Sequence, residues 1–308
     1  MLKCLDLNME TIVYQNNFDT FKIIKYCISN CEKGKNEMSY KLYVSDNCAT
    51  RQWDERSLAN EVKAILERPL LNVFKRHIKM PGANVLEAGC GLGAFCVYFL
   101  QNGCQIVGIE NQHSIVERAH YEMPGIPVEI GDVACIHYPD DSFDALISLG
   151  VIEHFEALGD IKNALKEAVR VLRPDGVAVI TVPANTITRC LFSHRIRDLY
   201  FLIRSLCGRR KYFGEYRFSM PELKSFVVQA GFDIIEEGVD DFSWNDLRNM
   251  GLYVDWPFLR DRKEMWRLNA FGTFLLKTLR LVFPEKAYCA GWYVVAQKKK
   301  QVIEKQIG

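Results

Sequence analysis

The sequence has almost no net charge and no long apolar run. Its 39 Lys and Arg residues against 38 Asp and Glu residues leave a formal net charge of +1 over 308 residues. Because no overall field attracts a polyanion, binding to DNA or RNA would need a local basic patch. No run of about 18 uncharged apolar residues occurs, and the mean hydropathy of −0.07 argues against a polytopic membrane protein.

The eleven cysteines form no metal-binding or disulfide framework. Their number is odd, no C-x-x-C pair occurs, and Cys27 and Cys31 lack a second pair or a histidine cluster to complete a zinc site. The first residues, MLKCLDLNMETIVYQ, lack the apolar stretch and the cleavage site of a signal peptide. We therefore expect a cytoplasmic protein with reduced thiols and no metal.

Strand-like and helix-like patterns alternate along the chain. Hydrophobic residues make up 49% of it and charged residues 25%, which excludes a disordered, collagen-like or fibrous chain. Strands are expected at 39–44, 84–88, 105–110, 127–130, 145–148, 177–182, 232–235 and 291–296, and helices at about 53–80, 94–101, 112–121, 161–172 and 219–230. This alternation predicts an α/β fold with a doubly wound parallel sheet.

The same patterns divide the chain into parts. Residues 1–80 are expected to form an N-terminal extension and a leading helix. Residues 81–297 are expected to form the main domain, interrupted by insertions at about 184–218 and 240–286. Residues 298–308 are expected to form a frayed tail.

A glycine-rich turn follows the first strand of the expected sheet. In VLEAGCGLG, residues 85–93, a strand leads directly into glycines and then into a helix. Glycines allow a tight turn and the close approach of a ligand, and the helix N-terminus offers free N–H groups. Glu110 ends the next strand, 19 residues after Gly91, where a carboxylate can accept hydrogen bonds from two ribose hydroxyls. Together these features indicate a cofactor that contains adenosine.

Two cofactors fit this loop. Gly89, Gly91 and Ala94 satisfy the dinucleotide pattern G-x-G-x-x-G/A, so NAD(P) is one of them. Glu87 favours the other, because a carboxylate there would repel a pyrophosphate but attract a cationic ammonium and sulfonium. Asp132 closes the third strand and would suit an exocyclic amine. In an open α/β sheet the carboxyl ends of the strands share one crevice, so these groups should lie together.

Several segments together resemble the class I S-adenosylmethionine-dependent methyltransferases, in particular methyltransferase-11-like proteins. The matching stretches are VLEAGCGLG, the acidic end of IVGIE, GDV, ALISLGVIEHF, RVLRPDGVAVITVP and FSMPELKSFVVQAGFDIIEEG. The resemblance implies a Rossmann-like sheet of seven strands, mostly parallel, with the last strand antiparallel. It also implies S-adenosylmethionine as the cofactor and S-adenosylhomocysteine as its product.

The resemblance further implies which residues bind the cofactor. They are Glu87 for the amino group, Gly89, Gly91 and Gly93 for the methionine part, Glu110 for the ribose hydroxyls, Asp132 and Val133 for the adenine, and Leu149 and Gly150 for backbone contacts to the methionine part. One departure is Asp175-Gly176, where the family more often has two glycines, and aspartate also suits a turn.

His154 is the candidate general base. Methyl transfer from a sulfonium is a direct displacement, so alignment and the exclusion of water matter most. A base is needed only where the proton of the acceptor must leave early, as for many hydroxyls. The pKa range of imidazole suits that task, and His154 lies just past the fourth strand of the sheet. The alternative is a histidine that orients its loop, and we interpret Glu153 as a structural or cofactor-side carboxylate.

The two insertions are expected on the lid or acceptor side of the site. Residues 189–217 hold eight basic and two acidic residues. Apolar residues recur at helical spacing there, namely Phe192, Ile196, Leu199, Ile203 and Leu206. This amphipathic helix could be a lid over the active site, could lie on an anionic membrane surface, or could present arginines to a substrate phosphate or carboxylate. The aromatic residues of the second insertion indicate either an acceptor pocket or a small added core.

We therefore expect transfer of a methyl group from S-adenosylmethionine to a small-molecule or lipid-type acceptor, with oxygen favoured as the acceptor atom. Nucleic acid is not expected as a partner, since the basic stretch carries no stacking motif. The alternatives are an NAD-linked oxidoreductase and a catalytically silent cofactor-binding protein that acts through partners. Peripheral contact with a membrane surface through residues 189–217 is a further hypothesis.

Overall fold

The computed structural model describes residues 40–44 and 56–299. The chain divides into two compact units, Met1–Glu37 and Met38–Gly308, and the described residues all belong to the second. Most of the expected tail, 298–308, lies outside the described residues.

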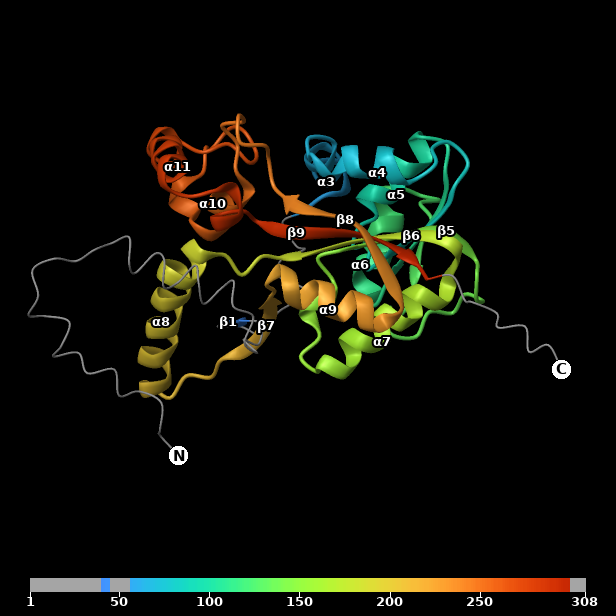
Figure 1. Cartoon of the computed structure of the whole chain (residues 1–308), viewed down its shortest axis with the longest axis horizontal. Coiled ribbons are helices and arrows are strands. Elements are labelled where there is room, and N and C mark those ends of the chain that lie inside the picture. Colours follow the sequence, from blue (N-terminus) through green and yellow to red (C-terminus); the bar gives the residue numbers. More distant parts are fainter. Residues whose placement is uncertain (1–39, 45–55, 300–308) are drawn as a thin grey trace, which may run out of the picture. The chain divides into compact units, whose positions relative to one another are not determined.

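One sheet of seven strands organises this unit, in the order β4-β3-β2-β5-β6-β9-β8 (Figure 1). Its strands are β2 (Asn84–Ala88), β3 (Gln105–Glu110), β4 (Val128–Ile130), β5 (Phe143–Leu149), β6 (Leu172–Pro183), β8 (Phe232–Asp240) and β9 (Gly291–Lys298). Neighbours from β4 to β6 pair in parallel, whereas β9 is antiparallel to both β6 and β8. The predicted seven-stranded, mostly parallel sheet is confirmed, and its antiparallel last strand lies inside the sheet rather than at an edge.

Helices cover both faces of the sheet. One hydrophobic cluster joins the sheet to α3 (Leu58–Leu66), α4 (Leu70–His77), α5 (Ala94–Gln101) and α6 (His113–Glu122), and a second joins it to α7 (Leu158–Val171) and α9 (Met220–Ala230). Figure 1 shows α3, α4 and α5 above the sheet and α7 and α9 below it. Along β2, Val85 belongs to the first cluster and Leu86 to the second, as expected for a strand that is covered on both faces.

Local sequence signals account for the helix ends. The α9 helix begins at a complete capping box, in which the Ser219 hydroxyl accepts from the Glu222 N–H and the Glu222 carboxylate accepts from the Ser219 N–H. It ends at Gly231, whose φ of 114° favours glycine. Both signals were predicted from the sequence, and both are confirmed.

The expected leading helix is in fact two helices, which corrects the prediction of one helix over residues 53–80. The α3 helix ends at Leu66 and α4 begins at Leu70, with Pro69 between them. Proline has no N–H to donate, and its ring clashes with the carbonyl of the preceding turn, so the first helix cannot continue through this position. The part of the predicted helix at 53–55 lies outside the described residues.

Both insertions leave the sheet at the edge where its parallel strands end. The first follows β6 and contains a π-helical turn (Arg189–Ser193), α8 (His194–Leu206) and β7 (Tyr212–Arg217), which pairs antiparallel with β1 (Tyr40–Val44). The second follows β8 and contains α10 (Met250–Asp255) and α11 (Ala270–Val282). A separate apolar cluster joins Leu252, Leu259, Leu268 and Leu276, so the second insertion forms a small added core of its own.

The apolar face of α8 does not cover the rest of the unit. The five apolar residues that predict this helix, Phe192 to Leu206 at helical spacing, are 54–80% exposed, and His194 is the one buried residue of α8. The hypothesis of a lid whose apolar face lies over the active site is therefore wrong for this conformation. None of the helices in the described residues is long and apolar enough to cross a membrane.

The capping box of α9 should carry measurable stability. We expect Ser219→Ala to lower the free energy of unfolding by about 1 kcal/mol, because the N–H of Glu222 loses its acceptor. Urea denaturation followed by circular dichroism measures the change. Ser225→Ala, on the exposed side of the same helix, is the matched control and should stay within about 0.5 kcal/mol of the parent protein. Equal losses in the two variants would contradict the role of the cap.

Candidate functional site

Three glycines shape the loop between β2 and α5. Gly89, Gly91 and Gly93 have φ angles of 79°, 55° and 82°, which other residues rarely adopt. A Cβ on Gly89 would lie 2.6 Å from a methyl carbon of Val151, and one on Gly93 would lie 2.6 Å from a methyl carbon of Val128. The loop therefore packs directly against the segment that follows β5 and against the first residue of β4, and side chains at these glycines would push them apart.

Glu110 lies beside this loop, as predicted. Its two carboxylate oxygens accept hydrogen bonds from the Gly91 N–H at 3.1 Å and from the Gln112 N–H at 3.0 Å. These bonds fix a buried carboxylate at the carboxyl end of β3. A carboxylate has about four lone-pair positions, so about two remain for a pair of ribose hydroxyls.

The remaining predicted residues extend the site to either side of Glu110. On the β4 side, the Gly131 N–H donates to the Glu110 carbonyl at 3.1 Å. Asp132, the next residue along the chain, is exposed. The Asp132 carboxylate accepts from the Ala134 N–H at 2.8 Å, and Val133 is partly buried against the second cluster. The structure thus brings Asp132, Glu110 and the glycine loop together along one edge of the sheet.

On the β5 side, Leu149 and Gly150 end the strand. Gly150 has a φ of 72°, and its N–H donates to the Thr181 carbonyl at 3.1 Å. Because Val151 touches Gly89, these residues adjoin the glycine loop. The residues predicted for the adenine, the ribose and the methionine part thus follow one another along this edge of the sheet, which agrees with the shape of S-adenosylmethionine.

Glu87 occupies a different environment from the one expected. Its carboxylate is buried and accepts a hydrogen bond from the Cys96 thiol of α5 at 3.2 Å. Burial raises the pKa of Glu87 to about 8. In this structure Glu87 packs beneath the loop against α5, and its contact with the cofactor amino group stays a prediction.

His154 and Glu153 differ sharply in their surroundings. His154 is exposed, and its Nδ1 lies 3.0 Å from the Gly214 carbonyl of β7, so Nδ1 carries the proton and donates it there. This bond suits a residue that orients its loop, and the role of His154 as a base stays a prediction. Glu153 is only 2% exposed, and burial raises its pKa well above the ordinary value.

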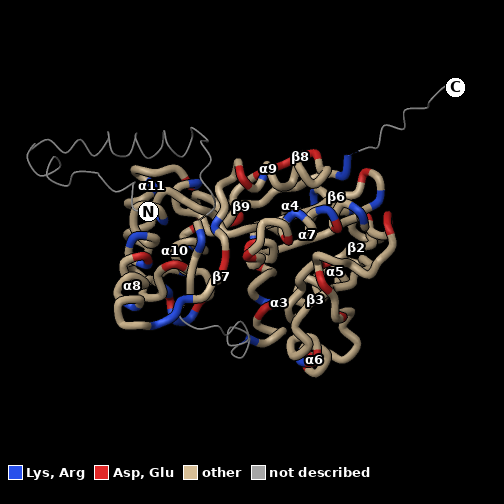
Figure 2. The backbone as a smooth tube through the Cα atoms, turned by 90° about the horizontal axis from the view of Figure 1, so that it is seen from below, with Lys and Arg blue, Asp and Glu red and all other residues tan. Residues whose placement is uncertain are grey.

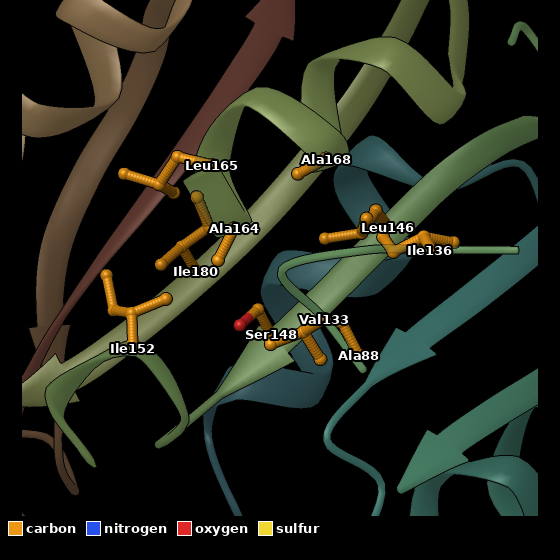
Figure 3. Close-up of a pocket in the computed structure, with 10 residues that line it drawn as sticks. All are labelled: Ala88, Val133, Ile136, Leu146, Ser148, Ile152, Ala164, Leu165, Ala168 and Ile180. Atoms are coloured by element: carbon orange, nitrogen blue, oxygen red, sulfur yellow. The ribbon is translucent and has the colours of Figure 1, made fainter. Parts of the chain in front are cut away.

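Two cavities lie near these strands. Figure 3 shows the smaller one, about 10 Å³ between the sheet and α7, where Ser148 is surrounded by apolar side chains. It has room for about one water molecule at most and is a packing defect rather than a ligand site. The larger cavity, about 260 Å³, adjoins Leu149 and Gly150, is lined by residues of both insertions and is open to solvent. Its polar lining consists of Arg68, Glu153, Thr181, Arg189, Glu215, Arg217 and Asp240.

A buried network of charges builds the wall of the larger cavity. Arg189 Nε donates to the Asp255 carboxylate at 2.7 Å, and Arg217 approaches the same carboxylate at 3.4 Å and Glu215 at 3.1 Å. Across the cavity, Arg68 pairs with Asp240. Asp255 belongs to α10, whereas Arg189 and Arg217 belong to the first insertion, so this network joins the two insertions.

Sequence reasoning counted Arg189 and Arg217 among the basic residues of an amphipathic surface. The structure buries both, at 2% and 7% exposure, so the surface charge of this insertion comes from the other six. The sequence predicts Glu153 as a structural or cofactor-side carboxylate, and the structure places it in the lining of the larger cavity. The one sequence signal for Glu153 is its place directly after the strand that ends in Leu149.

Comparison with known proteins identifies the domain. Residues 86–180 match a family model described as a methyltransferase domain. A probable S-adenosylmethionine-dependent methyltransferase of Mycolicibacterium smegmatis is 34% identical over 107 residues, which cover 35% of this chain and 40% of that protein. A sterol 24-C-methyltransferase of Yarrowia lipolytica is 36% identical over 104 residues, covering 32% and 26%. A tRNA (carboxymethyluridine(34)-5-O)-methyltransferase of Arabidopsis thaliana is 32% identical over 101 residues, covering 33% and 24%.

Solved structures show the same fold. A chain in the complex of the Haloferax volcanii Trm112 methyltransferase activator with a methyltransferase has a TM-score of 0.53 at 17% identity, covering 81% of this chain and 96% of that one. A SAM-dependent methyltransferase of Methanosarcina mazei has a TM-score of 0.51 at 17% identity, covering 73% and 96%. Residues 86–180 thus match a methyltransferase domain, and the described unit has the fold of S-adenosylmethionine-dependent methyltransferases.

The match to curated relatives is confined to this domain. The matched segment spans two fifths or less of the length of the relatives named above. Their acceptors differ from one another, and the insertions that line the larger cavity lie outside residues 86–180. The comparisons therefore favour S-adenosylmethionine over NAD(P) as the cofactor and leave the acceptor to be inferred from this chain.

The role of Glu110 can be tested by binding. We expect Glu110→Gln to weaken the binding of S-adenosylhomocysteine by about 1–3 kcal/mol, because the amide loses acceptor positions for the ribose hydroxyls. Isothermal titration calorimetry measures the affinity. Glu117→Gln, an exposed change on α6, is the control and should leave it unchanged. Full affinity in Glu110→Gln would remove Glu110 from the ribose site.

Proposed function

We propose that this protein transfers a methyl group from S-adenosylmethionine to a small-molecule or lipid-type acceptor, and that the acceptor atom is oxygen. The observation that carries the proposal is the Gly91 N–H bond to the Glu110 carboxylate, which joins the glycine loop to the end of β3. Asp132 and Gly150 flank this pair in the order that the cofactor requires.

The residues of the chain mainly bind and align the two substrates. Bound S-adenosylmethionine supplies a methyl group on a positively charged sulfur. Glu110 would hold the ribose, Asp132 and Val133 the adenine, and the backbone of Leu149 and Gly150 the methionine part. The larger cavity continues from Gly150 between the insertions, so an acceptor there would meet the methionine end of the cofactor. Buried walls would exclude water and hold the reacting atoms in line.

The acceptor cavity supports a small molecule rather than a nucleic acid. Its lining includes Arg189 and Arg217, whose charges pair with the carboxylates of Asp255 and Glu215. Cations that are already paired attract a polyanion weakly, and the chain as a whole carries a net charge of only +1. Three relatives bear names that include tRNA, but each matches only 33% of this chain.

Binding of the cofactor is the first test. We expect S-adenosylhomocysteine to bind at about micromolar Kd and NAD to show no heat of binding, because residues 86–180 match a methyltransferase domain, whose methyl donor carries no pyrophosphate. Calorimetric titration of the purified chain measures both ligands. Binding of NAD alone would overturn the methyltransferase proposal. Cofactor binding without turnover over a broad panel of acceptors would instead support a catalytically silent protein.

A second proposal concerns residues 189–217, which would contact an anionic membrane surface. The α8 helix exposes apolar side chains along its length, including Leu199 at 57% and Leu206 at 80%. Figure 2 shows basic residues on α8 and on the turn that follows it, where Arg209, Arg210 and Lys211 are exposed. An exposed apolar face next to basic residues is typical of helices that lie in a membrane interface.

Vesicle binding tests this surface. We expect the chain to sediment with vesicles of phosphatidylserine and phosphatidylcholine but not with phosphatidylcholine alone. The double change Leu199→Glu and Ile203→Glu should reduce sedimentation about tenfold or more, since it removes apolar area and adds negative charge. Val228→Glu, on exposed apolar surface of α9, is the control and should bind as the parent does. Equal binding of both variants, or no binding by the parent, would overturn the membrane proposal.

A further inference from the structure

Glu153 is a buried carboxyl for which neither the fold nor the cofactor site accounts. It lies in the short turn Ile152–His154, three residues after Gly150, and is 2% exposed. Its Oε2 is buried and has no hydrogen-bond partner in the described part of the chain. Glu153 lines the larger cavity, and its Oε1 lies 3.2 Å from where a Cβ on Gly150 would stand. A buried polar atom without a partner normally costs stability, so a functional reason is expected.

The charged groups around Glu153 are already matched with each other. They are Arg68, Asp240, Arg189, Asp255, Glu215 and Arg217. Arg68 pairs with Asp240, Arg189 with Asp255, and Arg217 with both Glu215 and Asp255. Three arginines therefore face three other carboxylates, and none of them forms an ion pair with Glu153. Burial raises the pKa of Glu153 well above its ordinary value, and the nearby Glu215 charge raises it further.

We propose that Glu153 accepts the proton of a hydroxyl acceptor and faces the positively charged sulfur of the bound cofactor. This inference rests on the proposed methyl transfer and adds a catalytic residue and an acceptor class to it. The observation that carries the inference is the position of the Glu153 carboxyl. It lies between Gly150, which is predicted to contact the methionine part, and the cavity that both insertions line. An acceptor hydroxyl in that cavity would donate its hydrogen bond to Oε2.

The step balances in atoms and charge. The hydroxyl oxygen of the acceptor uses a lone pair to form the new bond to the methyl carbon, while the electron pair of the carbon–sulfur bond stays on sulfur. The cationic sulfur becomes a neutral thioether. The hydroxyl proton moves to the Glu153 carboxylate, which becomes a neutral carboxylic acid. The proton then leaves to solvent through the cavity when the methyl ether departs.

A cationic neighbour explains how a buried carboxyl can be ionised when it is needed. Burial favours the protonated form of Glu153 and raises its pKa, although the nearby Arg217 charge acts in the opposite direction. A positive sulfur within a few ångströms favours the carboxylate, because opposite charges attract strongly where water is excluded. The positively charged methyl donor would thus favour the ionised carboxylate of Glu153. S-adenosylhomocysteine lacks the charge on sulfur and would not.

His154 is less suited to the same task. Its ring is exposed, its Nδ1 donates to the Gly214 carbonyl, and it does not line the larger cavity. Its bond to Gly214 ties the end of this turn to β7, and the amide N–H of a glutamine can donate to the same carbonyl. The two residues are adjacent in sequence, so they can be compared by matched amide substitutions.

The experiment compares two ligands that differ by the methyl group and the charge on sulfur. Calorimetry gives the Kd of S-adenosylmethionine and of S-adenosylhomocysteine for the full chain at several values between about pH 6 and about pH 9. We expect the ratio of the second Kd to the first to rise about tenfold or more with pH, because ionised Glu153 attracts only the cationic ligand. In Glu153→Gln the ratio should stay flat.

Each outcome has a distinct meaning. In His154→Gln the Kd ratio should depend on pH as it does in the parent. The inference would be overturned if the ratio lost its pH dependence in His154→Gln but kept it in Glu153→Gln. The same holds if both ligands bind and Glu153→Gln behaves as the parent does. Failure of either ligand to bind the parent would instead contradict the proposed function.

A measurement on the unsubstituted chain covers the case in which Glu153→Gln does not fold. Infrared difference spectra at about neutral pH report the carbonyl stretch of protonated carboxyl groups. We expect S-adenosylmethionine to remove intensity from this band, because one carboxyl ionises beside the positive sulfur. S-adenosylhomocysteine should leave the band unchanged. Identical difference spectra for the two ligands would overturn the inference.

Discussion

The acceptor side of the site depends on one buried carboxylate, that of Asp255. Asp255 lies in the second insertion, and two arginines of the first insertion, Arg189 and Arg217, both pair with it. All three side chains are largely buried. Moving such ions out of water costs several kcal/mol each, and the cost is offset only when every charge is paired. Removing Asp255 would leave the buried Arg189 without its carboxylate partner. The network therefore holds both insertions in the positions that line the larger cavity.

The cofactor side depends on backbone geometry instead. Positive φ angles at Gly89, Gly91 and Gly93 place N–H groups at the end of β2, and Glu110 fixes the next strand end to them. These features are local in sequence or lie on neighbouring parallel strands. Residues 86–180 match a methyltransferase domain, whereas the insertions lie outside the matched residues. The part that would hold the donor is thus separate from the insertions that would hold the acceptor.

This division also explains what the sequence could predict. Strand ends such as Glu110 can be predicted from short-range periodicity. The capping box and the glycine loop can be predicted from residue types at fixed spacing within a few positions. The break at Pro69 has a local signal that outweighs the continuous helical pattern around it. In contrast, the burial of Arg189 arises from Asp255, which lies 66 residues away, and the pairing of β1 with β7 joins segments even farther apart. Long-range contacts of this kind leave no periodic pattern in the chain.

The contrast between Glu87 and Glu153 shows why residue type alone did not identify the proton acceptor. Both are buried carboxyls next to strand ends, and burial raises the pKa of each. The Glu87 carboxylate has the Cys96 thiol as a donor and packs under the loop, so its burial is compensated within the fold. The Glu153 Oε2 has no such compensation in the described residues and borders a cavity. A carboxyl that the fold leaves unpaired beside a cavity is the one whose partner is best sought in the substrate.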